Sequence, residues 1–450
     1  MAKKKKGRKK KGKKGKKKKG RVGPAPPYYP VVLTTDYKFG QIIATSIAEK
    51  QKNDREAINR VIEGGIRISL HDQDQNQQFD NDDTDTRLLS LSRLTLDELP
   101  SGLDRLANNL TALDLSSNQL FDVEIVVNAI SLCTELREIN LNSNNLTGSI
   151  PNSINNLTRL ELLSADHNHI TSLPAQFADS CPSLVTLSLA NNDIKEIPVD
   201  FAVDGKWMNL HRLNVSKNQL TSLPTNIGCF TSLEMLKCGQ NTIAVLPASI
   251  GALAQLKLLD IGSNAILEIP IELEKCQQLN VLNVSSNGLT RIDSTLLKAL
   301  GTANLKQLYC YKNKISTLPP SIGHIGTLEI LSIANNKLTS LPEEIGGLCH
   351  LKELYIGGNT GLRAIPASCK GWSSIRALYA QNCGKLKTVP MQLAYCKNLR
   401  DLNVLSAKKK QTCVIYKSLL EYLPFMKVRG GKIKKDKKNK GHGGAPMLPP

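Results

Sequence analysis

Aromatic side chains are scarce in this chain, and several other common features are missing. Only 4% of its 450 residues are Phe, Trp or Tyr, although 40% are hydrophobic, so we expect a core packed on aliphatic side chains. No run of about 18 apolar residues occurs, which argues against a membrane-spanning helix. The 11 cysteines form no CxxC pair and no dense spacing, which argues against a disulfide framework and a cysteine metal site.

Catalytic and cofactor motifs are also missing. The sequence contains no GxxxxGK[ST], HExxH, GxSxG or kinase-type motif. The one segment that looks like a site is Asp166-His167-Asn168-His169. Asn168 falls on a repeated turn described below, so we expect His167 and His169 at the surface. The sequence therefore predicts a protein that is not an enzyme and has no cofactor and no metal.

Positive charge is concentrated at the two ends of the chain. Residues 1–21 hold 13 Lys, 2 Arg and no acid, and residues 427–440 hold 7 Lys, 1 Arg and 1 Asp. These segments carry +15 and +7, so the net charge of +20 leaves the other 415 residues at −2. A nearly neutral body argues against a wholly basic nucleic-acid-binding domain. We expect both ends to be disordered, because Lys-rich runs broken by Gly cannot bury a core.

The amino-terminal tail suits a polyanion such as nucleic acid, acidic lipid or an acidic protein surface. Its first residues, MAKKKKGRKK, are not followed by an apolar segment, so we expect no secretory signal and an intracellular location, either cytoplasmic or nuclear. The alternative is a solubilising tail that folds back on Asp72–Asp85. The candidate polyanion-binding residues are Lys3, Lys4, Lys5, Lys6, Arg8, Lys9, Lys10, Lys11, Lys13, Lys14, Lys16, Lys17, Lys18 and Lys19.

An internal repeat dominates the body of the chain. Segments such as LTALDLSSNQL (110–120), LVTLSLANNDI (184–194) and LEILSIANNKL (328–338) all fit LxxLxLxxNxL, and most continue into LPxxI. One position of the repeat is occupied by Asn118, Asn144, Asn168, Asn192, Asn218, Asn241, Asn264, Asn287, Asn313, Asn336 and Asn359. Leu94 precedes this series and Cys383 follows it, and neighbouring positions from 118 to 383 lie 23, 24 or 26 residues apart. About 13 leucine-rich repeats are therefore predicted.

The repeat pattern predicts an α/β solenoid. The LxL segment alternates like a short strand, so parallel strands should line a concave face, with short helices or 3-10 turns on the convex side. The repeated Asn should turn inward and bond backbone groups of the turn. Three spacings of 26 should add residues on the convex side. Cys133, Cys181, Cys276 and Cys396 recur three residues before a leucine, as buried thiols do.

The chain divides into five predicted segments. They are a disordered Lys-rich tail (1–21), a linker with an amino-terminal cap and an acidic loop (22–85), the leucine-rich-repeat domain (86–405), a carboxy-terminal capping helix (406–426) and a basic disordered tail (427–450). Within the second segment, residues 54–65 should form a helix and residues 66–70 an edge strand. Within the fourth, residues 413–426 read as an amphipathic helix.

The repeats resemble those of the intracellular Ras-group leucine-rich-repeat proteins. GGNTGLRAIP and QNCGKLKTVP are similar to the last two units of that family, and the resemblance covers about residues 54–405. The family includes a scaffold that joins Ras-type GTPases to a phosphatase, so the resemblance implies a signalling scaffold with a small GTPase as partner. Phosphatase docking would imply a basic-x-Val-x-Phe segment in the tail, and RVGPAP (21–26) lacks the aromatic residue.

A tyrosine-rich patch is the candidate protein-binding site. In the first nine units the outward strand position is small or polar: Ser90, Asp114, Asn140, Asp166, Ser188, Asn214, Lys237, Asp260 and Asn283. In units ten, twelve and thirteen it is Tyr309, Tyr355 and Tyr379, with Tyr311 beside the first. Tyr355 and Tyr379 should stack, and Ser332 should leave an open notch between Tyr309 and Tyr355. Lys312 and Arg376 add positive charge at the rim.

Two functions remain open at this point. Tyrosine is enriched at binding hot spots, so the preferred function is a non-enzymatic scaffold that binds a protein on its concave face. A tyrosine ladder that only covers strand edges is the structural alternative. The other function is a ribonucleoprotein or cytoskeletal component, such as a ciliary or microtubule protein, which its Lys-rich tails anchor to a polyanion.

Overall fold

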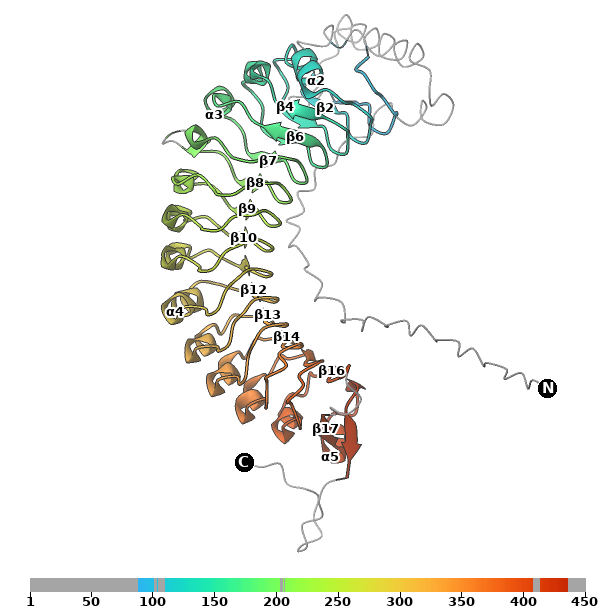
Figure 1. The fold of residues 1–450 in the computed structure, drawn as a ribbon, viewed down its shortest axis with the longest axis vertical. Coiled ribbons are helices and arrows are strands. Elements are labelled where there is room, and N and C mark those ends of the chain that lie inside the picture. The colour runs from blue at the N-terminus through green and yellow to red at the C-terminus, as the bar shows by residue number, and fades with distance from the viewer. Residues whose placement is uncertain are drawn as a thin grey trace, which may run out of the picture. The chain divides into compact units, whose positions relative to one another are not determined.

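The computed structural model describes residues 88–435, apart from 101–102, 104–109, 203–204, 206 and 408–412. Within these residues the repeats stack in an arc, with the helices along its outer side (Figure 1). In the described part of the chain, no helix is long and apolar enough to cross a membrane. The predicted leucine-rich-repeat solenoid is confirmed.

One parallel sheet of 15 strands runs through the described repeats. Each strand has three residues, and its middle residue points into the core: Leu236 and Leu259, which are paired across β9 and β10, are both fully buried. In order along the sheet, the strands are Leu88–Ser90 (β1), Ala112–Asp114 (β2), Glu138–Asn140 (β3), Leu162–Ser164 (β5), Thr186–Ser188 (β7), Arg212–Asn214 (β8), Met235–Lys237 (β9), Leu258–Asp260 (β10), Val281–Asn283 (β11), Gln307–Tyr309 (β12), Ile330–Ser332 (β13), Glu353–Tyr355 (β14), Ala377–Tyr379 (β15), Asp401–Asn403 (β16) and Lys427–Arg429 (β18).

Short helices occupy the opposite side of the described units. Among the described residues four are α-helices: Val123–Ile130 (α2), Phe177–Ser180 (α3), Ser294–Thr302 (α4) and Lys417–Tyr422 (α5). The others are 3-10 helices: Asn152–Asn156 (η2), Val199–Ala202 (η3), Ile227–Cys229 (η4), Ala248–Ala252 (η5), Ile271–Lys275 (η6), Pro320–His324 (η7), Glu343–Gly347 (η8), Ala367–Gly371 (η9) and Met391–Tyr395 (η10). Two smaller sheets pair Thr147–Ser149 (β4) with His169–Ser172 (β6) and Val414–Tyr416 (β17) with Lys432–Lys434 (β19).

The longer units place their extra residues in these helices, as predicted. Two of the three 26-residue spacings contain α2 and α4, and the third contains η3. Aspartates begin both α-helices: Asp122 accepts hydrogen bonds from the first-turn amides of α2, and Asp293 does so in α4. The amides of Leu296 and Thr295 also hold the pKa of Asp293 below its usual value. An acidic cap stabilises a helix because it satisfies amides that have no partner within the helix.

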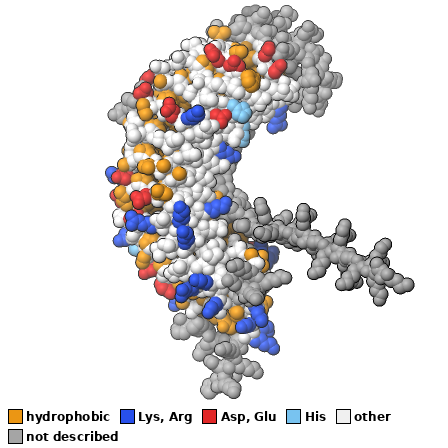
Figure 2. Space-filling model, viewed as in Figure 1, with side chains coloured by type: hydrophobic (Ala, Val, Ile, Leu, Met, Phe, Trp, Pro, Cys, Tyr) orange, Lys and Arg blue, Asp and Glu red, His pale blue; other side chains and the backbone are white. Residues whose placement is uncertain are grey.

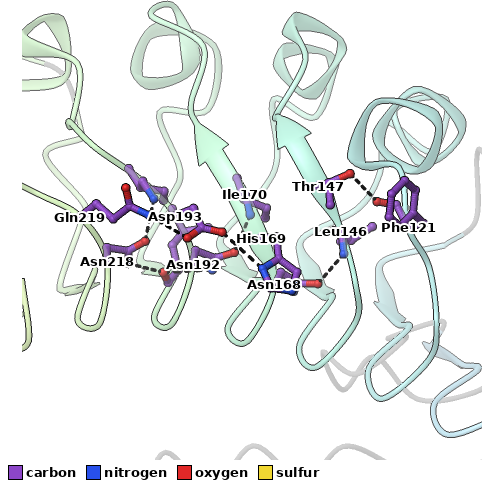
Figure 3. Close-up of polar contacts among 12 residues, drawn as sticks. Phe121, Leu146, Thr147, Asn168, His169, Ile170, Asn192, Asp193, Asn218 and Gln219 are labelled. Atoms are coloured by element: carbon purple, nitrogen blue, oxygen red, sulfur yellow. Dashed lines mark hydrogen bonds and ion pairs between the residues drawn. The ribbon is translucent and has the colours of Figure 1, made fainter.

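The repeated asparagines form the predicted ladder. Asn118 donates to the carbonyls of Leu91 and Leu115 at 2.9 Å, and its Oδ1 accepts from the amide of Leu94 at 2.9 Å. Asn168 and Asn192 bind the preceding unit in the same way (Figure 3). The residue before each rung has a left-handed backbone, from Ser117 at φ +58° to Asn382 at φ +59°, which the repeat pattern alone did not predict. Each rung therefore joins two units through buried polar groups.

The predicted buried thiols are confirmed. Cys133, Cys181, Cys276 and Cys396 are at most 1% exposed. Burial raises the pKa of Cys181 and of Cys396 to about 12 and that of Cys276 to about 11. The last three thiols are therefore protonated at neutral pH, and all four cysteines act as small packing groups.

Aromatic residues contribute more to the core than their scarcity predicted. Trp207 lies 5.5 Å from Phe177, 4.7 Å from Phe201 and 6.0 Å from Phe230, measured between ring centroids. Its indole Nε1 donates to the carbonyl of Cys181 at 3.1 Å. The prediction of an aliphatic core is wrong in this region, because three successive units place their few large rings at adjacent positions.

Glycines set the spacing of the convex helices. A Cβ atom built on Gly323 in η7 would lie 2.2 Å from the carbonyl oxygen of Glu344 in η8. No atom lies within 4 Å of the corresponding position on Gly326, three residues later. The two glycines therefore offer a matched pair, one in close backbone contact and one in open space.

We expect Gly323→Ala to lower the free energy of unfolding by about 1–3 kcal/mol, the usual cost of overpacking. Gly326→Ala should be neutral or stabilising by up to about 1 kcal/mol, because alanine reduces the freedom of the unfolded chain. Urea titrations of the two variants measure this difference. Equal stability of both variants would contradict the close contact between η7 and η8.

The carboxy-terminal segment differs from its prediction in two ways. The helix expected over residues 413–426 is confined to α5, and β17 precedes it, because Val414 is drawn into pairing with Lys432 of β19. The disordered tail expected from residue 427 is wrong for residues 427–434. There, β18 pairs with β16 and extends the main sheet, and Val428 packs against the core. Two strands, β16 and β18, therefore follow the 13 units that were counted from sequence.

Several sequence predictions lie outside the described residues. They are the tail 1–21 with its polyanion-binding lysines, the helix 54–65, the edge strand 66–70, the acidic loop and the end of the chain beyond residue 435.

Candidate functional site

The tyrosines of the candidate site lie in register across four neighbouring strands. Tyr309 pairs with Ser332, Ser332 with Tyr355, and Tyr355 with Tyr379. All four residues occupy the third strand position, which faces away from the leucine core and onto the inner side of the arc. The placement of the tyrosines on one face was predicted correctly.

The predicted open notch between Tyr309 and Tyr355 is wrong. Ser332 is 0% exposed, and Tyr309 and Tyr355 are only 1% and 8% exposed. Side chains on the inner side of a curved sheet converge, so the large neighbours of a small residue can close over it. Tyr309 and Tyr355 therefore form the floor of the site and not the two walls of a cleft.

The predicted stack of Tyr355 on Tyr379 is confirmed. Their ring centroids lie 4.6 Å apart with an interplanar angle of 13°. Tyr379 is the more exposed of the two, since it remains partly accessible while Tyr355 is buried. Stacking fixes both rings, so Tyr379 presents a rigid aromatic surface that needs little further ordering when a partner binds.

The buried tyrosine hydroxyls are held by their own strands. Tyr355 donates to Glu353 at 2.5 Å, and Tyr309 donates to Gln307 at 3.0 Å. Burial raises the pKa of Tyr309 to about 12, and Glu353 and Tyr311 add smaller upward shifts. Burial and the bond to Glu353 also raise the pKa of Tyr355. Both phenols are therefore neutral at physiological pH and act as hydrogen-bond donors within their own strands.

The basic residues of the predicted rim lie on opposite sides of the tyrosines. Lys312 is exposed in the turn after β12, where its backbone is left-handed at φ +55°. Arg376 is exposed at the other end of the repeat, directly before β15. Tyr311 is partly exposed beside Lys312. The structure thus brings the tyrosines together in one row and places Lys312 and Arg376 at its two borders.

The inner face of the earlier units is polar and differs in one position from the prediction. Ser164, and not Asp166, pairs with Ser188, so the outward position of the fourth unit was assigned two residues too late. Asp166 accepts hydrogen bonds from the Ser188 hydroxyl at 2.7 Å and from the Ala190 amide at 2.6 Å. Burial raises the pKa of its carboxyl, and the bonds to Ser188 and Ala190 lower it in part. Asp166 therefore has a structural role between two units.

The histidines beside Asp166 lie at the surface, as predicted. His167 is exposed with a left-handed backbone, and Asn168 is the buried ladder residue between them. His169 is exposed and lies 3.3 Å from Asp193, which also accepts a bond from Gln219 (Figure 3). Nowhere in the described ranges do three or more His, Cys, Asp or Glu side chains gather as metal ligands would.

Comparison with known proteins agrees with this geometry. A model of the leucine-rich repeat region matches residues 263–429, and a second leucine-rich-repeat model matches residues 135–157. The chain has the leucine-rich-repeat fold. The matches include β12 to β16 and therefore the whole tyrosine row. No curated protein sequence matches the chain.

Solved leucine-rich-repeat structures share the fold. A leucine-rich-repeat protein of Leptospira interrogans is 26% identical, with a TM-score of 0.59, over 76% of this chain and 95% of that chain. A plant peptide hormone receptor in complex with its ligand is 24% identical, with a TM-score of 0.59, over 75% of this chain and 57% of that chain. An internalin of Listeria monocytogenes is 19% identical, with a TM-score of 0.56, over 68% and 86%. Leucine-rich-repeat solenoids of this kind provide extended concave surfaces for protein binding.

Proposed function

We propose that this leucine-rich-repeat protein is a non-enzymatic scaffold that binds a protein partner on the inner face of β12 to β15. The observation that carries the proposal is the rigid stack of Tyr379 on Tyr355 between two exposed basic residues, Lys312 and Arg376. A preorganised aromatic surface loses little entropy on binding, and tyrosine is enriched among residues that dominate interfaces. The complementary partner surface has an apolar or aromatic group flanked by acidic residues.

A Ras-type GTPase is the first partner to test, because the sequence resembles Ras-group leucine-rich-repeat proteins. A peptide or protein ligand also fits the fold, since the plant receptor noted above was solved with a bound ligand. The alternative, in which the Lys-rich tails anchor the protein to a polyanion, stays a prediction. Salt dependence distinguishes the scaffold function from polyanion anchoring, because polyanion binding weakens steeply with ionic strength and a tyrosine-centred contact does not.

Truncating the exposed ring of the stack should weaken partner binding about tenfold, as expected for an interface hot spot. The test compares wild-type chain, Tyr379→Ala and Ser188→Ala in a quantitative capture experiment at elevated salt, followed by titration of purified GTPase. Ser188→Ala is the control, because Ser188 occupies the same outward strand position eight strands away. If Tyr379→Ala keeps every partner at wild-type affinity, the tyrosine row is structural and the proposed site is wrong.

A further inference from the structure

The net charge of the folded body is close to zero, but its acidic and basic residues are concentrated toward opposite ends of the solenoid. The described residues from 88 to 202 contain 4 Lys and Arg against 13 Asp and Glu. Those from 370 to 435 contain 12 Lys and Arg against 2 acids. Figure 2 shows red side chains toward the end that holds the first repeats and blue side chains gathered at the other end. The carboxy-terminal units, together with the paired strands of residues 427–434, therefore carry a basic surface.

Part of this surface is an ordered row, here named the basic ladder: Lys352, Arg376, Arg400 and Lys427. Lys352, Arg376 and Arg400 directly precede β14, β15 and β16, whereas Lys427 is the first residue of β18 and pairs with Asp401, one residue beyond this row. Consecutive members are joined by backbone hydrogen bonds. The Arg376 amide donates to the Lys352 carbonyl at 2.7 Å, Arg400 to Arg376 at 2.8 Å, and Lys427 to Arg400 at 2.7 Å. Neighbouring strands lie about 4.8 Å apart, so Lys352, Arg376 and Arg400 span about 10 Å in a line, and Lys427 lies one strand further and one residue along.

Nearby acids neutralise only one end of the ladder. Glu329 pairs with Lys352 at 2.6 Å and marks one end of the row. Arg429 of β18 forms an ion pair with Asp401 at 3.2 Å. The strand that contributes Lys427 therefore also contributes the cation that neutralises Asp401. Arg376, Arg400 and Lys427 are exposed. A row of exposed like charges is destabilising for the protein alone, which points to a negatively charged ligand.

An exposed aromatic ring completes the surface. Phe425 is 76% exposed and lies two residues before Lys427. The guanidinium of Arg400 lies 5.9 Å from the centre of its ring. Arg400 itself is held by bonds from Nη1 to the carbonyls of Lys397 and Leu399, at 2.7 and 3.2 Å. One aromatic ring is therefore held at the end of a line of cations and remains largely open to solvent.

We infer that the basic ladder and Phe425 form a binding site for single-stranded nucleic acid. The cations would track successive phosphates, and the open Phe425 ring would stack on a base, the combination that proteins use to bind single strands. An acidic peptide would use the charges but leave the ring without a stacking partner. Arg376 borders both this site and the proposed protein-binding site, whereas Lys427, Arg400 and Phe425 lie outside the tyrosine row. Phe425→Ala and Tyr379→Ala therefore report on the two sites separately.

The test measures the full chain binding a fluorescent oligo(dT) of about 12 nucleotides, a length within the usual site sizes. Titrations between about 50 and 300 mM salt give the slope of log affinity against log salt. Removing two ladder charges with Arg376→Gln/Lys427→Gln should make that slope shallower by about 1.4, since each phosphate contact contributes about 0.7 for single strands. The control pair, Arg137→Gln/Lys257→Gln, removes the same charge from residues that directly precede β3 and β10, as Arg376 precedes β15, and should leave the slope unchanged.

The ring is tested separately. Phe425→Ala should weaken oligo(dT) binding about fivefold to a hundredfold without changing the slope, because stacking is not ionic. Phe425→Trp should retain binding. Comparing variants of the full chain cancels any contribution from the Lys-rich tails.

Two results would overturn the inference. In the first, the ladder pair and the control pair change the slope equally, so the ladder makes no phosphate contact. In the second, Phe425→Ala binds oligo(dT) like wild type while the ladder variants weaken binding to a poly-glutamate peptide or to phosphatidylserine vesicles. That outcome would assign the surface to an acidic protein or a membrane. Either failure leaves the Tyr379 result, and with it the proposed function, unaffected.

Discussion

The Trp207→Ala variant should lose about 3–5 kcal/mol of unfolding free energy, the usual cost of deleting a fully buried indole. Trp207 is 1% exposed, and its ring lies beside Phe201 of its own unit, Phe177 of the preceding unit and Phe230 of the following unit. Removing it leaves a cavity between these units and deprives the Cys181 carbonyl of its donor. Both effects act on the same interface between neighbouring repeats.

The adjacent residue gives a matched control for this prediction. Met208 is 52% exposed, so Met208→Ala should change the unfolding free energy by less than about 0.5 kcal/mol. The unfolding free energy of both variants is measured by guanidinium titration. Unfolding is monitored by far-UV circular dichroism, because this signal does not depend on tryptophan fluorescence. A loss of less than 1 kcal/mol for Trp207→Ala would show that the aromatic cluster does not join the units.

The second large effect concerns the strand register. Leu236→Ala removes a fully buried side chain from the middle of β9 and should destabilise the protein by about 2–5 kcal/mol. Lys237 follows it on the inner face and is partly exposed, so Lys237→Ala should cost less than about 0.5 kcal/mol. A denaturant titration that finds equal effects would contradict the alternation of core and inner-face residues in the strands.

The regular parts of the fold could be predicted from the sequence because the repeats share one spacing of leucine and asparagine residues. Leucines at fixed spacing predicted the strands, and an asparagine at fixed spacing predicted the ladder, in which Asn118 and its equivalents join successive units. The convex side was less predictable. Trp207 and its ring neighbours come from irregular positions, and the glycine contacts between η7 and η8 depend on backbone approach that side-chain patterns do not reveal.

The carboxy-terminal end was mispredicted for a specific reason. Lysines in residues 427–434 gave the composition of a disordered tail, yet Val428 and Ile433 alternate with them and allow both short strands to form. A pattern of two or three apolar residues is too short to distinguish a strand from a solvated segment. Pairing with β16 and β17, which the sequence does not display, supplies the remaining stabilisation.

The candidate site was partly predictable. Tyr309, Tyr355 and Tyr379 occupy equivalent repeat positions, which predicted that they share one face. Tyr355 and Tyr379 lie on adjacent strands, which predicted that their rings stack. The closure over Ser332 was missed, because it depends on ring orientation and on the curvature of the sheet. The basic ladder was missed because total charge was summed over a body whose two ends have opposite sign.

Site-specific photo-crosslinking tests the central claim, that the inner face near Tyr379 binds the protein partner, most directly. The chain would carry p-benzoylphenylalanine in place of Tyr379, or, as a control, in place of Tyr395 on the convex helix η10, where the native ring is 38% exposed. The account predicts a crosslinked partner from position 379 and none from position 395. Crosslinking from position 395 alone, or equally from both, would contradict it.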